Sequence, residues 1–229
     1  MEDILTQHMP NVDVWMCNLE RAAGAFREPA LEDRQAAESY TNERLRSRFL
    51  ISRWMLRSIL SEYAGISGEA LRFRQGRYGK LYLRRHAGAR VHFNISHSRD
   101  RLLVAVSTAG PVGVDIEHVR PIDAAWLARY WFSRTERREW AGITAASRLE
   151  AFFHGWARKE AFIKATGFGL AMPLDSFSVS LQPRHAELRE VRGVAPGRWR
   201  LNRIDAGPDC AAAVVTCGEP GEIRIREAA

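Results

Sequence analysis

The sequence feature that most constrains the fold is a pattern that occurs twice along the chain. Each half has a long helical stretch, then a glycine-containing break, then strand-like segments that end in an apolar run. The long helices are predicted at Glu43–Tyr63 and Leu149–Thr166, and the apolar runs lie at Leu102–Ser107 and Ala211–Thr216. We therefore expect an α+β fold with two similar α/β subdomains, although coincidence among ordinary α+β elements would give the same pattern.

Composition sets the class of protein. Of the 229 residues, 46% are apolar, which is enough to bury a core and excludes wholesale disorder. No stretch approaches 18 consecutive apolar residues, so no transmembrane helix is predicted. Residues 1–11 contain Glu2 and Asp3 and no long apolar run, so no signal peptide is predicted. The three cysteines lack CxxC spacing, which indicates neither a zinc site nor a disulfide framework. We expect a cytoplasmic protein.

The positive charge comes almost entirely from arginine. The formal net charge is +7, and the basic residues are 31 Arg and only three Lys, at Lys80, Lys159 and Lys164. A GC-rich genome explains such a bias. A lysine that remains can nevertheless mark a position where a compact ammonium is needed, because arginine and lysine are not interchangeable at phosphate sites.

Several arginines gather in the first long helix, at Arg44, Arg46, Arg48, Arg53 and Arg57. They form either a solvated helix face or an anion site, for nucleic acid or for a phosphorylated small molecule. Broad nucleic-acid binding usually comes with a recognisable module, and the sequence has no zinc-finger, KH or RNP pattern.

Two carboxylates share one face of a predicted strand. In Gly113-Val114-Asp115-Ile116-Glu117, residues two apart point to the same side, so Asp115 and Glu117 lie next to each other. Adjacent carboxylates on an apolar strand are unfavourable without a cation, and a hard divalent ion with oxygen ligands is the usual partner. A strand end at the surface, with both acids hydrated or paired with arginine, explains the pattern equally well.

The second long helix carries a further acid and a lysine on one face. Trp156, Glu160 and Lys164 are spaced i, i+4 and i+8. Glu160 is placed to reach a metal held by Asp115 and Glu117, and Lys164 to neutralise a phosphate bound to that metal. An ordinary salt bridge between Glu160 and Lys164 is the structural alternative.

A polar tip ends another predicted strand, in Asn94-Ile95-Ser96-His97-Ser98. A nucleophilic serine is disfavoured, because adjacent Ser and His rarely reach that geometry and no third orienting group is evident. A phosphate grip by hydroxyl, imidazole and backbone N–H is more plausible, and a capped turn is the alternative.

In chain order, the three motifs at residues 94–98, 113–117 and 156–164 resemble those of the phosphopantetheinyl transferases of the larger, monomeric, surfactin-synthetase-activating type. The third motif reads Trp-Ala-Arg-Lys-Glu-Ala-Phe-Ile-Lys from Trp156, and two further segments, 132–136 and 169–177, also match. The resemblance covers roughly residues 30 to 180. It implies a holo-[acyl-carrier-protein] synthase, which transfers the 4′-phosphopantetheine arm of coenzyme A to a serine of an apo acyl or peptidyl carrier protein and releases adenosine 3′,5′-bisphosphate.

The resemblance also implies residue roles. Asp115, Glu117 and Glu160 would hold Mg2+, with Mn2+ as the other candidate ion, and Glu160 and Lys164 would be catalytic. Glu160 would act as base, directly or through a water. The residues expected to bind coenzyme A are Arg48, Lys80, Ser96, His97, Asp115, Glu160 and Lys164. Leu81 stands where the family often has proline after the lysine, Arg34 matches an upstream basic residue only loosely, and Lys159 is given no role.

The family architecture implies two subdomains, 1–112 and 113–229, related by a pseudo-twofold axis with the coenzyme A cleft between them. It also implies a monomer that binds neither nucleic acid nor membrane. Segment 118–140 is expected to dock the acidic carrier, through Arg120, Arg129, Arg134, Arg137, Arg138, Trp126, Trp131 and Phe132, although these aromatics would equally suit a core. A basic metal-dependent nuclease or other nucleic-acid-binding protein is the alternative function. A carrier-binding protein that has lost catalysis is a third.

Overall fold

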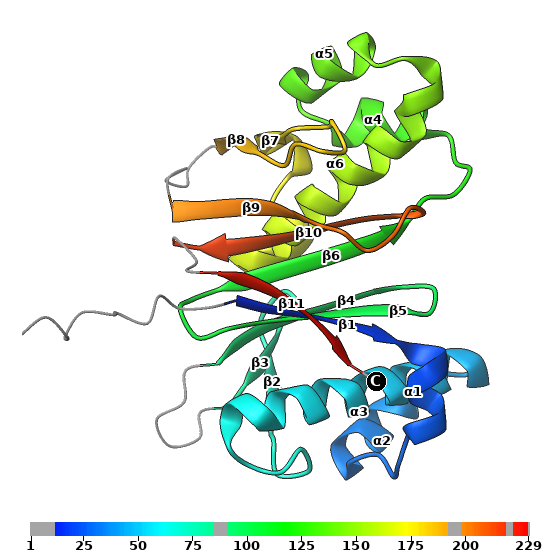
Figure 1. The fold of residues 1–229 in the computed structure, drawn as a ribbon, viewed down its shortest axis with the longest axis vertical. Coiled ribbons are helices and arrows are strands. Elements are labelled where there is room, and N and C mark those ends of the chain that lie inside the picture. Colours follow the sequence, from blue (N-terminus) through cyan, green and yellow to red (C-terminus); the bar gives the residue numbers. More distant parts are fainter. Residues whose placement is uncertain (1–11, 85–90, 192–197, 219–221, 229) are drawn as a thin grey trace, which may run out of the picture.

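The computed structural model describes residues 12–84, 91–191, 198–218 and 222–228 (Figure 1). The segment on which the absence of a signal peptide was predicted, residues 1–11, lies outside this part of the chain. The chain is α+β, as expected from the alternation of helix and strand patterns. Within the described ranges, no helix is both long enough and apolar enough to cross a membrane.

One sheet of four strands belongs to the first half of the chain. Its order is β11-β1-β5-β4, where β1 spans Val12–Asn18, β4 His92–Ser98, β5 Arg101–Ser107 and β11 Ile223–Ala228. Helices α1 (Leu19–Ala25) and α3 (Glu43–Ala64) cover its outer face, and α2 (Leu31–Ala37) packs against α3. The hairpin of β2 (Phe73–Gln75) and β3 (Leu81–Leu83) follows α3. The short helix α1 is absent from the sequence prediction.

The second sheet has three strands in the order β6-β10-β9, which span Val112–His118, Cys210–Cys217 and Trp199–Ile204. Its outer face packs against the long helix α6 (Ala145–Thr166). Helices α4 (Ala124–Trp131) and α5 (Arg134–Gly142) and the hairpin of β7 (Phe177–Val179) and β8 (Leu188–Val191) surround α6. Two single turns of 3-10 helix, η1 (Gly169–Ala171) and η2 (Leu174–Ser176), link α6 to β7.

The inner faces of the two sheets bury a common apolar core. Val14 and Leu103 of the first sheet share this cluster with Val114 and Val214 of the second. The molecule therefore stacks in four layers, helices, sheet, sheet and helix (Figure 1). This arrangement brings β4 of the first half next to β6 of the second.

The last strand returns to the first half. β11 pairs in parallel with β1, from Val12 opposite Ile223 to Cys17 opposite Ala228. Asp13 of β1 is buried and accepts hydrogen bonds from Arg224 Nε at 2.7 Å and from Tyr63 Oη at 2.5 Å. The strand that ends the predicted subdomain 113–229 thus completes the sheet of 1–112. The division at residue 112 remains a prediction.

Candidate active site

Where the two sheets meet, side chains of β4 bind the backbone of β6. Asn94, Ser96 and Ser98 alternate along β4 and face β6. They accept hydrogen bonds from the backbone N–H groups of Val114, Ile116 and His118, at 2.8, 3.4 and 2.9 Å. The polar strand tip that the sequence placed in a phosphate grip is therefore also the seam between the halves of the molecule.

Asp115 lies at the centre of this seam, with 3% of its surface exposed. Its Oδ1 accepts hydrogen bonds from Ser96 Oγ at 2.7 Å and from the ammonium of Lys164 at 2.6 Å. Its Oδ2 is buried and has no hydrogen-bond partner among the described residues. A buried carboxylate oxygen without a partner is unfavourable, so this atom is available to an additional ligand.

Two more carboxylates face Asp115. Burial and the charge of Asp115 raise the pKa of Glu160 to about 7, with Lys164 opposing the shift. Burial and Asp115 also raise the pKa of Glu117, against Arg120, which donates to Glu117 Oε2 at 3.3 Å. The salt bridge between Glu160 and Lys164, which was the structural alternative, does not form within the described part of the chain, because Lys164 bonds to Asp115 instead. Asp115 and Glu117 thus pair with Lys164 and Arg120, and Glu160 has no ion-pair partner among the described residues.

The donor set fits a hard divalent cation. Three carboxylates line one cavity, and one of their oxygens is buried without a partner. In the described residues they do not converge into a ready-made cluster of three metal ligands. In this structure the cation that pairs with Asp115 is the ammonium of Lys164.

The cavity that holds these groups measures about 770 Å³, within the range of small-molecule sites. Its walls come from both halves of the chain. Helix α3 and strand β4 contribute Arg48 and His97, and β6 and α6 contribute the carboxylates and Lys164. Arg53, one of the arginines of the first long helix, also lines it, and so does Arg99, which was not selected from the sequence. The structure therefore gathers seven of the predicted residues in one place: Arg48, Ser96, His97, Asp115, Glu117, Glu160 and Lys164.

Two predicted basic residues lie outside this cavity. Lys80 lines a neighbouring cavity together with Glu160 and Lys164, and it directs its ammonium to backbone carbonyls at the end of α6 and the start of β6. Arg34 is exposed and pairs with Glu28 at 3.1 Å. The neighbouring Asp33, which the sequence prediction overlooked, is 1% exposed and binds the Nε atoms of Arg53 and Arg57. The arginine cluster of α3 is thus neither wholly solvated nor wholly ligand-binding.

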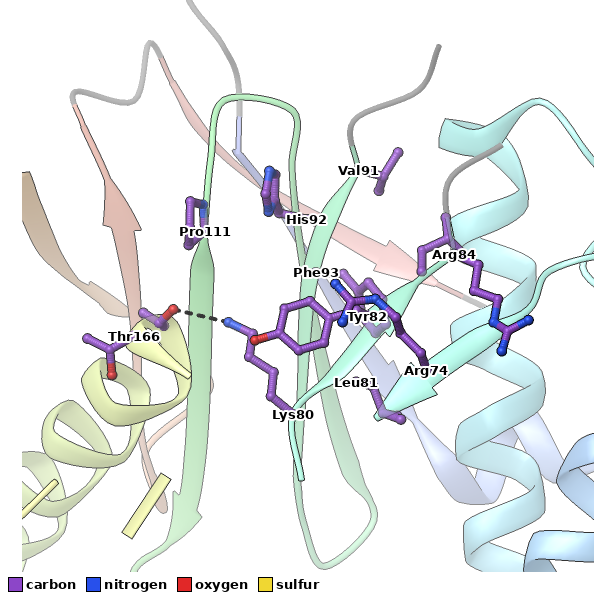
Figure 2. Close-up of a pocket in the computed structure, with 12 residues that line it drawn as sticks. Arg74, Lys80, Leu81, Tyr82, Arg84, Val91, His92, Phe93, Pro111 and Thr166 are labelled. Carbon is purple, nitrogen blue, oxygen red and sulfur yellow. Dashed lines mark hydrogen bonds between the residues drawn. The ribbon is translucent and has the colours of Figure 1, made fainter. Parts of the chain in front are cut away.

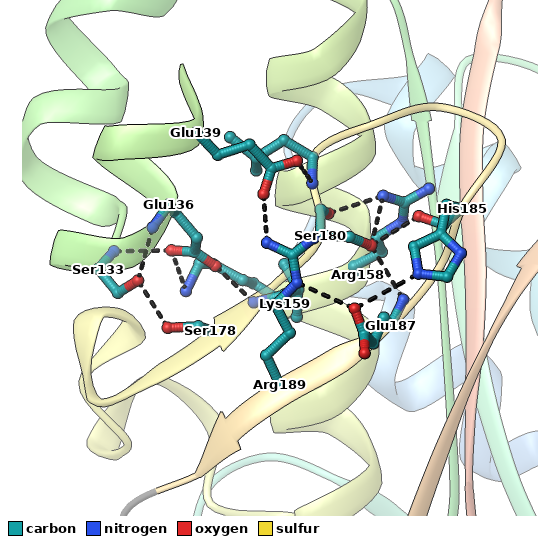
Figure 3. A network of polar contacts seen from close by, with 12 residues as sticks. Ser133, Glu136, Glu139, Arg158, Lys159, Ser178, Ser180, His185, Glu187 and Arg189 are labelled. Atoms are coloured by element: carbon teal, nitrogen blue, oxygen red, sulfur yellow. Dashed lines mark hydrogen bonds and ion pairs between the residues drawn. The ribbon is translucent and has the colours of Figure 1, made fainter. Parts of the chain in front are cut away.

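Lys159, which had no predicted role, is fully buried beside the site (Figure 3). Its ammonium pairs with Glu136 Oε2 at 2.8 Å and donates to the carbonyls of Leu174 at 2.6 Å and Phe177 at 2.9 Å. Glu136 is also fully buried and closes the capping box of α5 with Ser133. Lys159 therefore anchors α6 to α5 and to the η2–β7 segment, one residue before Glu160.

The predicted docking segment is only partly exposed. Trp126 and Trp131 are accessible, and so is Tyr130, which the sequence prediction did not select. Phe132 is fully buried against Trp140 and Phe152, so it is a core residue and the expectation that it is a docking anchor was wrong. Trp131 lies edge-on to Trp156, with ring centroids 6.0 Å apart, and Trp156 lines the catalytic cavity.

Comparison with known protein families gives two matches that together cover most of the chain. A model described as "4'-phosphopantetheinyl transferase superfamily" matches residues 111–215. A model described as "4'-phosphopantetheinyl transferase, N-terminal" matches residues 14–109. The first contains the acidic strand and the helix with Glu160 and Lys164, and the second contains Arg48 and the Ser-His tip.

Individual relatives agree with these matches. The chain is 35% identical over 150 residues to 4'-phosphopantetheinyl transferase Sfp of Bacillus subtilis, which covers 66% of this chain and 65% of Sfp. It is 34% identical over 175 residues to 4'-phosphopantetheinyl transferase HetI of a Nostoc species, covering 76% of this chain and 72% of HetI. A solved structure titled "Chronobacterium ammoiniagenes apo-ACPS structure" aligns with 45% of this chain and 92% of its own, at 28% identity and a TM-score of 0.34.

Proposed function

This chain belongs to the 4'-phosphopantetheinyl transferase family, and on that premise we propose that it transfers the 4'-phosphopantetheine arm of coenzyme A to a serine of an apo carrier protein. The serine oxygen forms a bond to the phosphorus that carries the pantetheine arm. The bond from that phosphorus to the bridging oxygen of the pyrophosphate breaks, and adenosine 3',5'-bisphosphate leaves. The serine proton passes to a base in the site.

The cationic wall of the cavity suits the phosphates of coenzyme A. Arg48 and His97 extend from the first half of the chain, and Lys164 lies opposite on α6. We assign Arg48 and His97 to holding the substrate phosphates and Lys164 to the phosphate that is attacked. Placing the reacting groups in this way accounts for much of the acceleration available to phosphoryl transfer. Ser96 acts mainly on Asp115, because its hydroxyl is already bonded to that carboxylate.

The acidic wall suits Mg2+, or Mn2+, held by Asp115, Glu117 and Glu160. When bound, the ion would act as a Lewis acid and a template for the pyrophosphate. The unpartnered Oδ2 of Asp115 is the atom that most clearly awaits such a ligand.

Glu160 is the candidate base. Without a bound cation its pKa is raised to about 7, and Mg2+ on the same carboxylate would lower that pKa, which favours proton transfer through a water over direct transfer. It receives the proton of the incoming serine hydroxyl, directly or through a water.

A single observation carries the proposal. One cavity joins Arg48 and His97 of the first half to three carboxylates and a lysine of the second, with one carboxylate oxygen left without a partner. Acidic and basic groups that gather in one cavity, with the pKa of one acid raised, are typical of a catalytic site.

The test is transfer itself. Incubating the protein with an apo carrier protein, coenzyme A and Mg2+ should increase the intact mass of the carrier by one phosphopantetheine arm. A chelator should abolish the gain, and a carrier whose acceptor serine is changed to alanine should not be modified. No gain with several unrelated carriers would contradict the proposal, and cleavage of a nucleic acid by the same preparation would favour the nuclease alternative.

We further propose that the exposed faces of α4 and α5 receive the carrier. The rings of Trp126 and Tyr130 lie on the surface with centroids 4.8 Å apart and a tilt of 52°, and Arg134 and Arg138 are exposed on the next helix. Arg137 instead donates to the carbonyls of Arg129 and Phe132 at 3.1 and 2.9 Å, so it caps α4. An acidic carrier would be attracted to this surface, which continues through Trp131 and Trp156 to the cavity.

The docking surface is tested by charge reversal at Arg138. Arg138→Glu should raise the KM for the carrier several-fold at low salt and leave the KM for coenzyme A unchanged. Arg27→Glu is the matched control, because Arg27 is exposed beyond α1 in the other half of the molecule. Equal effects of the two variants would show that net charge, not this surface, governs the association.

A further inference from the structure

Lys80 makes an unusual set of contacts for a residue expected to bind a phosphate. It directly precedes β3, and its Nζ donates hydrogen bonds to the carbonyls of Lys164 at 2.6 Å, Val112 at 3.0 Å and Ala165 at 3.1 Å, the last of which is drawn in Figure 2. An ammonium has three protons, so these three acceptors use all of them. The side chain thus links the hairpin of the first half to β6 and α6 of the second.

Two of the three acceptors are carbonyls that a helix leaves unpaired. The last four carbonyls of a helix have no partner within it, and this end carries partial negative charge. In α6, the carbonyl of Ile163 accepts from the backbone N–H of Gly167, while those of Lys164 and Ala165 accept from Lys80. A cation supplied by a distant segment therefore completes the C-terminal end of α6.

Close packing at the same place leaves little freedom for the helix. A Cβ at Gly113 would lie 2.1 Å from the carbonyl oxygen of Ala161 and 2.3 Å from the backbone nitrogen of Ala165, so α6 rests directly on the backbone of β6. Gly167 ends the helix with a φ of 78°, and a Cβ there would lie 3.0 Å from the Tyr82 hydroxyl. β6 and α6 therefore meet backbone to backbone, and the side chains of Lys80 and Tyr82 bring the hairpin against them.

The carbonyls that Lys80 binds lie in, or within three residues of, the residues that carry the proposed catalytic groups. Lys80 holds the backbone carbonyl of Lys164, whose own ammonium reaches Asp115 Oδ1 at 2.6 Å. It also holds the carbonyl of Val112, three residues before Asp115 on β6. The distance between the lysine and the carboxylate therefore depends on an anchor that touches neither reacting group.

We propose that Lys80 is a positioning residue, whose ammonium fixes the end of α6 against β6 and so sets Lys164 relative to Asp115. The proposal rests on the proposed transferase function and differs from the role that the family resemblance implies, in which Lys80 binds coenzyme A. Arginine cannot replace it, because three acceptors converge on one nitrogen, whereas a guanidinium spreads its donors over a planar fork.

The first arm of the test is kinetic. Lys80→Met should lower kcat about 10- to 100-fold, the size expected when catalytic groups shift by about 1 Å, while the KM values for coenzyme A and carrier stay nearly unchanged. Lys80→Arg should not restore kcat. Tyr82→Phe, on the same hairpin, is the matched control and should change kcat by no more than about twofold. A tenfold rise in the KM for coenzyme A at unchanged kcat would overturn the proposal and make Lys80 a ligand-binding residue.

The second arm does not need activity. In Lys80→Met, amide hydrogen exchange at Gly167 and in the last turn of α6 should become at least about tenfold faster, while exchange in α3 stays unchanged. If the wild-type protein transfers nothing to any carrier, the proposed function fails, and this exchange measurement still decides the anchoring. Should Lys80→Met not fold, Lys80→Gln replaces it, because glutamine keeps an N–H donor without the charge. Unchanged exchange in the last turn of α6 would overturn the proposal.

Discussion

Helix α6 has two faces on which charged residues behave differently. On the anchoring face, Arg158 and Lys159 are buried and bonded: Arg158 donates to the carbonyls of Ser180 at 2.7 Å and Pro183 at 3.0 Å, and Lys159 pairs with Glu136. On the catalytic face, Glu160 and Lys164 border a cavity, and the acids outnumber their cationic partners.

Charged groups with a full set of protein partners stabilise the fold, whereas charged groups that border the cavity remain available to a ligand. A buried ion with a full set of partners restrains the helix, and removing one partner leaves the other charge buried and unpaired. A half-buried acid with a raised pKa contributes little to stability, but it is ready to bind a cation or accept a proton. Lys159 and Glu160 are neighbours in sequence, yet Lys159 holds the fold and Glu160 is available to a ligand.

The largest effect is expected from Glu160→Gln. The change removes the candidate base and one of three metal-binding carboxylates, so transfer should fall by at least about a thousandfold. The fold should remain, because the residue lines a cavity and has no buried partner charge to leave unpaired. An intact-mass assay measures the loss of transfer, and circular dichroism measures whether the fold is kept. A variant that is still active would contradict the catalytic role of this face.

Lys159→Met should show the opposite pattern, chiefly a loss of stability. It leaves Glu136 buried without its cation, which costs about 3–5 kcal/mol in comparable buried pairs. Glu160→Gln is the matched control on the same helix, because Glu160 lines the cavity and leaves no buried partner charge unpaired. Urea unfolding should show a much smaller loss for Glu160→Gln, together with a large loss of activity. Equal destabilisation by the two variants would contradict the comparison.

Acid should destabilise the anchoring face through His154. Burial, with Arg158 and Arg203 nearby, lowers the pKa of His154 to about 4 from its ordinary 6.5, and Glu150, 3.8 Å away, offsets this only partly. Between these values the unfolded chain binds a proton that the folded chain does not, so stability falls as the pH drops from about 6.5 to about 4.

The measurement is the free energy of unfolding against pH. The contribution of His154 has a maximum slope of about 1.4 kcal/mol per pH unit, and His154→Leu should remove it. An identical pH profile in the two proteins would show that this histidine is not buried in its neutral form.

The smallest effect is stabilisation by Mg2+ on the catalytic face. An ion that binds only the folded protein should add about 1.4 kcal/mol to the free energy of unfolding at ten times its Kd. Asp115→Asn should abolish this increment, whereas Arg138→Glu, on α5, should retain it. An increment that survives Asp115→Asn would place the ion elsewhere.

Much of the catalytic face could be predicted from the sequence because its signals are local. Alternation along a strand placed Asp115 and Glu117 on one side, and four-residue spacing on a helix placed Glu160 and Lys164 together. The structure gathers these residues in one cavity. Their assigned roles in metal and substrate binding stay predictions.

The anchoring face could not be predicted in this way. Lys159 and Glu136 are both fully buried, although charged residues are mostly exposed, and their partners lie on other elements. The same holds for Asp33 beneath α3, and for Phe132, whose aromatic ring suited a docking surface and a core equally well. Burial depends on what the rest of the chain places over a residue, and periodicity carries no information about that.

The three lysines show the division most clearly. The sequence alone determined that lysine is rare in this chain and that two of the three lie on the helix of the third motif. Only the tertiary structure decided that each ammonium meets several converging acceptors: carbonyls at Lys80, a carboxylate and carbonyls at Lys159, and Asp115 with Ser96 at Lys164. The acceptors of Lys80 lie up to 85 residues away. Local propensity sets helices and strands, whereas the meeting of distant polar groups depends on how those elements pack.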